Sequence, residues 1–109
     1  MKKDVRKTCP LEAASSVVGG KWKSVILYRL LNNTMRFNEL LRSIPDVTRR
    51  MLTLQLRELE KDGLISRKVY HQVPPKVEYS LTSLGKALEE NLELLRQWGE
   101  KYLKSKHQK

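Results

Sequence analysis

Cysteine and histidine are scarce in this chain of 109 residues, which has one cysteine, Cys9, and two histidines, His71 and His107. A single cysteine excludes an internal disulfide framework and is typical of proteins in a reducing cytoplasm. The three side chains lack the spacing of metal ligands, so the sequence predicts neither a metal site nor a cofactor. No convergent set of acid, base and nucleophile groups is evident either, and we therefore do not expect an enzyme.

Long apolar runs are also missing. No segment approaches the ~18 apolar residues of a membrane span. The stretch LEAASSVVGG carries Glu12 in place of a sustained apolar run, so no signal peptide is expected. Without repeats, low-complexity stretches or linkers, the chain is predicted to be a single cytoplasmic domain over residues 1–109, with an N-terminal arm at residues 1–8.

Glycine is infrequent, and its one pair, Gly19-Gly20, is followed by Lys21 as in some phosphate-binding loops. Such a loop needs another glycine five residues before the second glycine, and a Ser or Thr directly after the lysine. Here Ser15 and Trp22 occupy those two positions. Because glycine readily takes the left-handed conformation that ends a helix, the pair instead predicts a junction between two helices.

Acidic residues are outnumbered. The chain has 12 Asp and Glu against 22 Lys and Arg, which gives a net charge of +10 and a pI near 10.0. This excess favours a polyanionic partner, nucleic acid first and an acidic membrane surface second. Charge alone leaves a third interpretation open, a basic surface with no function of its own.

Apolar spacing predicts three helices in the first half of the chain. Pro10 suits the first position of a helix that Cys9 caps and the glycine pair ends. A second helix is expected at about residues 21–31, and a third has apolar residues at i, i+3, i+4 and i+7 over residues 37–44. These helices precede the segment with the clearest charge pattern.

The segment TRRMLTLQLRELEKDG predicts a fourth helix over residues 48–62, which Thr48 caps and Gly63 terminates. One stripe of this helix is apolar and is expected to be buried: Leu52, Leu56 and Leu59. A different arc faces solvent or a ligand, with Leu54 toward it, and carries Arg49, Arg50, Thr53 and Arg57. The helix is therefore basic at its beginning, and its acidic residues follow near its end.

A β-hairpin is predicted next, at about residues 65–81, because β-branched and aromatic residues replace the helical period. Its strands are expected at Ile65–Tyr70 and Val77–Leu81, with Pro74-Pro75 in the loop between them. The hairpin adds three cations: Arg67, Lys68 and Lys76.

The last helix is predicted at about residues 82–104, with Thr82 as its cap. It carries more apolar surface than one small domain needs to cover, so we expect a dimerisation helix that packs against a second copy of the chain. The predicted interface residues are Leu88, Leu92, Leu95, Trp98 and Tyr102.

These elements predict a mainly α fold with a small β-hairpin wing, a winged helix-turn-helix with an N-terminal helix and a long C-terminal dimerisation helix. A helix fits the major groove of DNA, where base edges differ, while wing cations bind phosphates. The expected base contacts are Arg49, Arg50 and Thr53. The expected phosphate contacts are Arg57, Arg67, Lys68 and Lys76, and Thr48 completes the predicted DNA-binding set.

Several blocks, in order, resemble the HxlR-type transcriptional regulators of bacteria: CPLEAASSVVGGKWKSVIL, RFNELLRSIPDVTRRMLTLQLRELEKDGLISRKVY and VPPKVEYSLTSLGKAL. The resemblance runs from about Cys9 to Gly99. It implies a dimeric winged helix related to the MarR class that binds palindromic operator DNA, with the recognition helix at Thr48–Asp62 and the wing at Tyr70–Val77. Cys9 matches the position at which some members carry a redox- or electrophile-sensing thiol.

Two alternatives stay open. The basic end of the last helix, KYLKSKHQK, is compatible with a membrane-surface module. However, Glu89, Glu90, Glu93 and Glu100 occupy much of its polar side, so no membrane partner is predicted. A protein-interaction module without specific DNA binding is the other alternative, because a fold does not settle a function.

Overall fold

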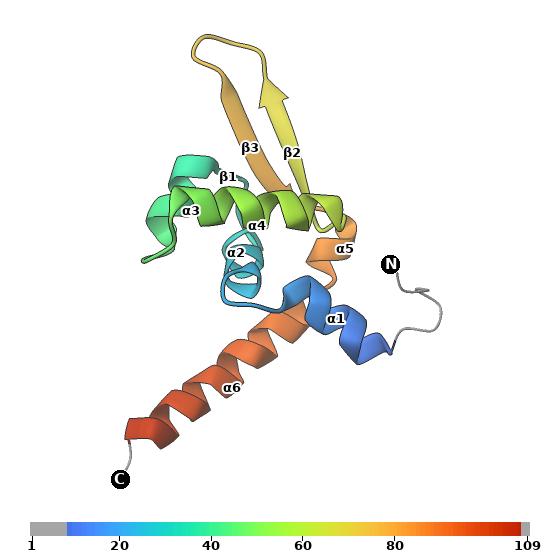
Figure 1. Ribbon diagram of the computed structural model, residues 1–109, viewed down its shortest axis with the longest axis vertical. Coiled ribbons are helices and arrows are strands. Elements are labelled where there is room, and N and C mark those ends of the chain that lie inside the picture. Colours follow the sequence, from blue (N-terminus) through green and yellow to red (C-terminus); the bar gives the residue numbers. More distant parts are fainter. Residues whose placement is uncertain (1–8, 108–109) are drawn as a thin grey trace.

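The computed structural model describes residues 9–107, in which packed helices support a narrow antiparallel sheet and a long last helix extends away from them (Figure 1). The predicted order of three helices, recognition helix, hairpin and C-terminal helix is present. The elements are α1 (Pro10–Val18), α2 (Lys23–Arg29), β1 (Met35–Arg36), α3 (Phe37–Ser43), α4 (Arg49–Lys61), β2 (Ile65–Tyr70), β3 (Lys76–Leu81), α5 (Ser83–Lys86) and α6 (Glu89–His107).

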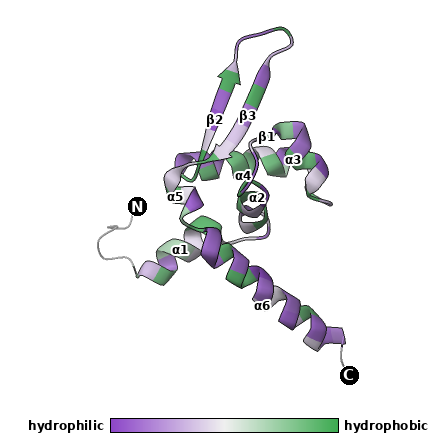
Figure 2. Cartoon of the chain, turned by 180° about the vertical axis from the view of Figure 1, so that it is seen from behind, coloured by the Kyte–Doolittle hydropathy of each residue, from purple (hydrophilic) through white to green (hydrophobic). Residues whose placement is uncertain are grey.

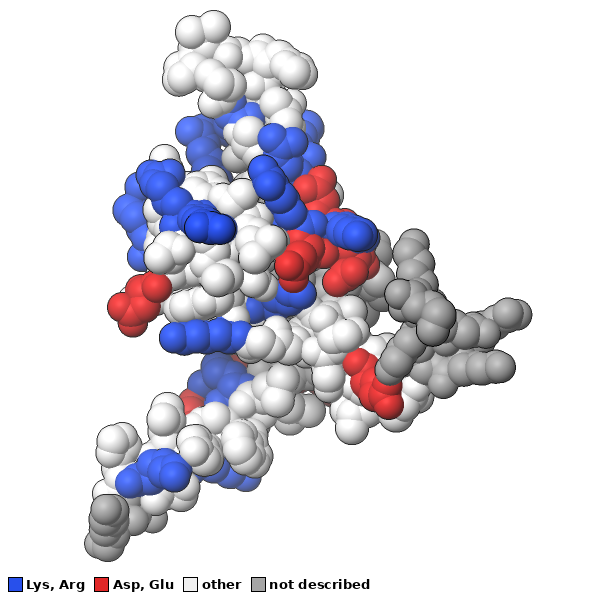
Figure 3. Space-filling model, in the orientation of Figure 1, with Lys and Arg blue, Asp and Glu red and all other residues white. Residues whose placement is uncertain are grey.

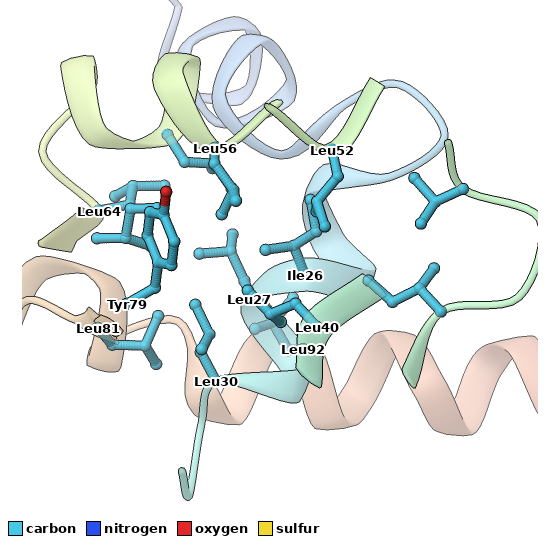
Figure 4. Packing of buried hydrophobic residues seen from close by; sticks show 14 residues of the cluster. Ile26, Leu27, Leu30, Leu40, Leu52, Leu56, Leu64, Tyr79, Leu81 and Leu92 are labelled. Atoms are coloured by element: carbon cyan, nitrogen blue, oxygen red, sulfur yellow. The ribbon is translucent and has the colours of Figure 1, made fainter. Parts of the chain in front are cut away.

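The core lies where α2, α3 and α4 meet the base of the sheet (Figure 4). The side chains of Leu52, Leu56 and Leu59 are almost completely buried, as the apolar stripe of α4 predicted. They pack with apolar residues of α2, of α3 and of β3, and with Leu64 just before β2, which Figure 4 labels. Burying such side chains contributes roughly 1.5–3 kcal/mol each. Because this stripe is buried in the core, the opposite face of α4 is held exposed to solvent.

Three helix ends agree with the sequence. Gly20 has a φ of 80° and stands between α1 and α2, so the glycine pair is a helix junction and not a phosphate-binding loop. Thr48 caps α4, because its hydroxyl oxygen accepts a hydrogen bond from the amide of Met51 at 3.0 Å. Gly63, also with a φ of 80°, follows Asp62, the C-cap of α4, and lets the chain turn into β2.

A short strand, β1, was not predicted. Met35 pairs with Tyr79, and Arg36 pairs with Glu78, so the sheet has the order β1-β3-β2. Two residues are too few to show an alternating pattern. The strand ties the start of α3 to the hairpin, which holds the wing and the helix-turn-helix together.

The prediction of one continuous helix over residues 82–104 was wrong. Thr82 does act as a cap, but it caps the short α5, and a separate α6 then continues to His107. Gly85 lies so close to the carbonyl oxygen of Leu64 that a Cβ atom there would overlap it. Packing therefore fastens α5 to the start of β2, and the chain must turn before α6 can lie against α2. The helical spacing of the leucines shows nothing of this turn.

Within residues 9–107, no helix is long and apolar enough to cross a membrane.

Candidate nucleic-acid interface

The exposed face of α4 lies opposite its buried stripe. Arg49, Arg50 and Arg57 are exposed, and Thr53 is half-buried. Together with Leu54, these side chains line a shallow recess of about 450 Å³. Figure 3 shows Lys and Arg gathered over this part of the molecule and over the body of the wing, while Asp and Glu gather near the end of α4. The helix therefore presents cations where a DNA groove would meet its first half.

The polar groups of this face are not equally free. The guanidinium of Arg49 donates a hydrogen bond to Oδ1 of Asn38 at 3.2 Å and lies 5.7 Å from the ring centre of Phe37. The hydroxyl of Thr53 donates to the carbonyl oxygen of Arg49 at 2.8 Å. The structure gives Arg50 no hydrogen bond or ion pair with any residue between 9 and 107. Arg50 is thus the base-contact candidate whose donors are all available.

The cations of the wing are held in place by a tyrosine. Lys68 and Lys76 place their Nζ atoms 4.9 and 4.8 Å from the ring centre of Tyr70. Lys76 also forms an ion pair with Glu78 at 3.3 Å. The Tyr70 hydroxyl, and then the Lys76 ammonium, hold the pKa of Glu78 below its usual value. These four side chains share one face of the hairpin, since Lys68 pairs with Glu78 and Tyr70 with Lys76.

Arg67 lies on the other face of the hairpin. It lines a recess of about 400 Å³ between α4 and the sheet, together with Thr53, Arg57, Glu60 and Tyr79. The predicted phosphate contacts therefore form two groups. Arg57 and Arg67 meet beside α4, and Lys68 and Lys76 meet on the wing.

Sequence reasoning missed the residues that position these cations. Asn38 and Phe37 hold Arg49, and Tyr70 holds the two lysines. Lys23, which is 9% exposed, forms an ion pair with Glu58 at 2.8 Å and so links α2 to α4. The hairpin register could have revealed the pairing of Tyr70 with Lys76, whereas the contacts between helices leave no local pattern.

Cys9 stands at the N-cap of α1 and is exposed. Its side chain makes no regular capping hydrogen bond, yet the backbone amides of Glu12 and Leu11 lower the pKa of the thiol. Amide groups at a helix start favour the thiolate in this way. The N-terminal arm that the sequence predicts at residues 1–8 lies outside the described part of the chain.

The apolar face of α6 is largely uncovered, because the helix extends beyond the other elements (Figure 2). Leu95 is 55% exposed and Trp98 is 62% exposed, and the Trp98 ring stacks on Tyr102 at 5.5 Å between ring centres. Leu92 differs from the prediction. It is 4% exposed and belongs to the core of its own chain, where it anchors the start of α6. Leu88 is half-buried against the same core.

This combination of an exposed basic helix, a basic hairpin wing and supporting helices is the fold of the winged helix-turn-helix proteins. The family model described as the HxlR-like helix-turn-helix matches residues 17–107, and the chain belongs to that family. It is a DNA-binding transcriptional regulator and not an enzyme, as the sequence predicted.

Several relatives share most of the chain. The helix-turn-helix transcriptional regulator YdeP of Bacillus subtilis (strain 168) is 56% identical over 94 residues, which cover 86% of this chain and 73% of YdeP. The redox regulator HypR in its oxidized form has 55% identity and a TM-score of 0.81, over 85% of this chain and 96% of HypR. Its reduced form has 52% identity and a TM-score of 0.83, over 89% and 99% of the two chains.

Proposed function

We propose that the chain acts in the cytoplasm as a homodimer that binds a palindromic operator and regulates transcription in response to oxidants or electrophiles. The observation that carries this proposal is the pairing of two surfaces on one chain. The first half of α4 and the wing present cations, and α6 presents an uncovered apolar face. A two-fold axis through α6 would bury that face without producing an open-ended assembly.

The division of work within the interface follows from the contacts. Arg50 donates to a base edge, and Arg49 is oriented by Asn38 at the start of α4. Arg57, Arg67, Lys68 and Lys76 neutralise phosphates and supply affinity that does not depend on sequence. Thr48 fixes the first turn of α4 as its cap. In a dimer the two recognition helices would meet successive turns of one face of the duplex, about 34 Å apart.

Selection of binding sites from random duplex DNA tests the proposal. We expect the selected sequences to contain two inverted half-sites whose centres are separated by about one helical turn. Co-sedimentation with anionic vesicles, at the same ionic strength, is the comparison for a membrane-surface module. Vesicle binding without any enriched DNA sequence would contradict the proposed function.

The proposed signal acts at Cys9. Because its pKa is lowered, more of this exposed thiol is ionised at neutral pH than of an ordinary cysteine, and the thiolate is the reactive form. A relative with 55% identity, HypR, is described as a redox regulator. Diamide would take two electrons from a pair of thiolates and join them as a disulfide, either between the Cys9 residues of the two protomers or with a small thiol. Either product would change the position of α1 in the dimer and hence the distance between the two recognition helices.

Operator affinity before and after diamide treatment measures this response. In the wild-type protein we expect a change of about 5- to 150-fold, the usual range of coupling between two sites. The oxidation rate should rise with pH as the thiol ionises and level off at a lower pH than for a free cysteine, because the pKa is lowered. The Cys9→Ser variant should bind the operator with an affinity that diamide treatment does not change. An equal response of both proteins, or of neither, would show that Cys9 is structural.

A further inference from the structure

Leu54 is an apolar side chain on the face of α4 that the arginines occupy. It is 47% exposed. Helical geometry places it roughly 160° around the axis from both Leu52 and Leu56 of the buried stripe. It therefore lies on the side of α4 that is turned away from the core and toward solvent.

The surroundings of Leu54 are polar. It shares its recess with Arg49, Arg50, Thr53 and Arg57. Arg49 donates one hydrogen bond of its guanidinium to α3, and the hydroxyl proton of Thr53 is bound to the backbone of α4, so both side chains already have a partner within the chain. Leu54 thus places apolar surface beside the guanidinium of Arg50. Because apolar surface in water is unfavourable, a partner that covers this leucine would stabilise the complex.

We infer that Leu54 packs against the C5-methyl group of a thymine and thereby selects T·A over C·G at one position of each half-site. This inference rests on the proposed function and adds the chemistry of one base to it. The thymine methyl is the apolar group that the major groove offers, and cytosine lacks it. Arg50 and Leu54 are four residues, or ~6 Å, apart along the axis. With a base-pair rise of ~3.4 Å, the thymine lies within about two base pairs of the base that Arg50 contacts.

Deoxyuridine tests this contact, because it differs from thymidine by the methyl group alone. The thymines of the selected operator are replaced by deoxyuridine one position at a time, at the equivalent position of both half-sites. The affinities of wild type and Leu54→Ala are then measured for each duplex. At one thymine, deoxyuridine should weaken wild-type binding by about fourfold per half-site, the effect of one buried methyl group. The same replacement should leave the affinity of Leu54→Ala unchanged.

Two controls accompany the experiment. Arg50→Ala lies on the same helix and should still lose affinity with deoxyuridine, because it leaves the methyl contact in place. Circular dichroism should show an intact fold for Leu54→Ala, since alanine favours the helix. If deoxyuridine at every position affects wild type and Leu54→Ala equally, or if no thymine lies within reach of the Arg50 contact, the inference is overturned while the proposed function stands. A wild-type protein without any sequence preference overturns both.

Discussion

Replacing Leu95 and Trp98 together by glutamate is expected to convert the protein to a monomer and to weaken operator binding by ~100-fold or more. Both side chains are more than half exposed, and burying each at an interface contributes roughly 1.5–3 kcal/mol in each protomer. A monomer also loses the advantage of binding two linked half-sites, which is worth about 10²–10⁴ in affinity. Sedimentation velocity and operator titrations measure the two effects.

Leu92 is unsuitable for this test, because glutamate in the core would unfold the chain. The matched control is Gln97→Glu with Lys104→Gln, which lowers the net charge by the same amount on the opposite side of α6. This control should remain dimeric and bind the operator nearly as well as wild type. A wild-type protein that is monomeric at micromolar concentration, or a glutamate variant that still dimerises, would contradict the proposed interface.

Replacing Arg50 by alanine is expected to cost on the order of 1–3 kcal/mol per half-site on the operator and much less on random DNA. The reason is that Arg50 has no hydrogen bond or ion pair with any residue of the described range, 9–107, so that its donors can bind a guanine edge through two hydrogen bonds. The ratio of the two affinities, measured by fluorescence anisotropy on both duplexes, reports this loss of specificity.

The control for Arg50→Ala is Lys68→Ala in the wing. Lys68 contacts the Tyr70 ring but makes no ion pair among residues 9–107, whereas the charge of Lys76 is partly offset by Glu78. Losing one phosphate contact per protomer should weaken binding to both duplexes alike. It should also reduce the slope of the logarithm of the binding constant against the logarithm of salt concentration by about one per half-site. If Arg50→Ala instead behaves like Lys68→Ala, Arg50 binds phosphate and another residue makes the base contact.

Local signals explain how much of the fold was predictable. The boundaries of α1, α4 and β2 follow from caps, glycines and apolar periods, which depend on neighbouring residues. The break between α5 and α6 depends on the close approach of Gly85 to Leu64, twenty-one residues earlier in the chain. The short β1 depends on pairing with Tyr79 and Glu78. Such contacts are tertiary and leave no period in the sequence.

For the candidate site, the positions of the charged residues were predictable from the sequence, but their hydrogen-bond partners were not. Sequence placed Arg49 and Arg50 as equals, since both begin the exposed arc. The structure separates them because Asn38, on the preceding helix, accepts a hydrogen bond from Arg49, whereas Arg50 has no such partner among residues 9–107. Leu92 shows the same limit, because helical spacing alone cannot tell a leucine that faces its own core from one that faces solvent.

The break between α5 and α6 separates the helix-turn-helix and its wing from the long helix α6. α6 is fixed to the core through Leu92 and through the hydroxyl of Tyr28, which donates to Glu93 at 3.3 Å, and its last turns extend away from the helix-turn-helix (Figure 1). In evolutionary terms the chain is modular. In the proposed dimer, substitutions along the outer turns of α6 would alter the distance between the two operator half-sites, and substitutions on the exposed face of α4 would alter the bases that each half-site contains. If the proposed dimer is correct, half-site spacing and half-site sequence could change one at a time, with the core left intact.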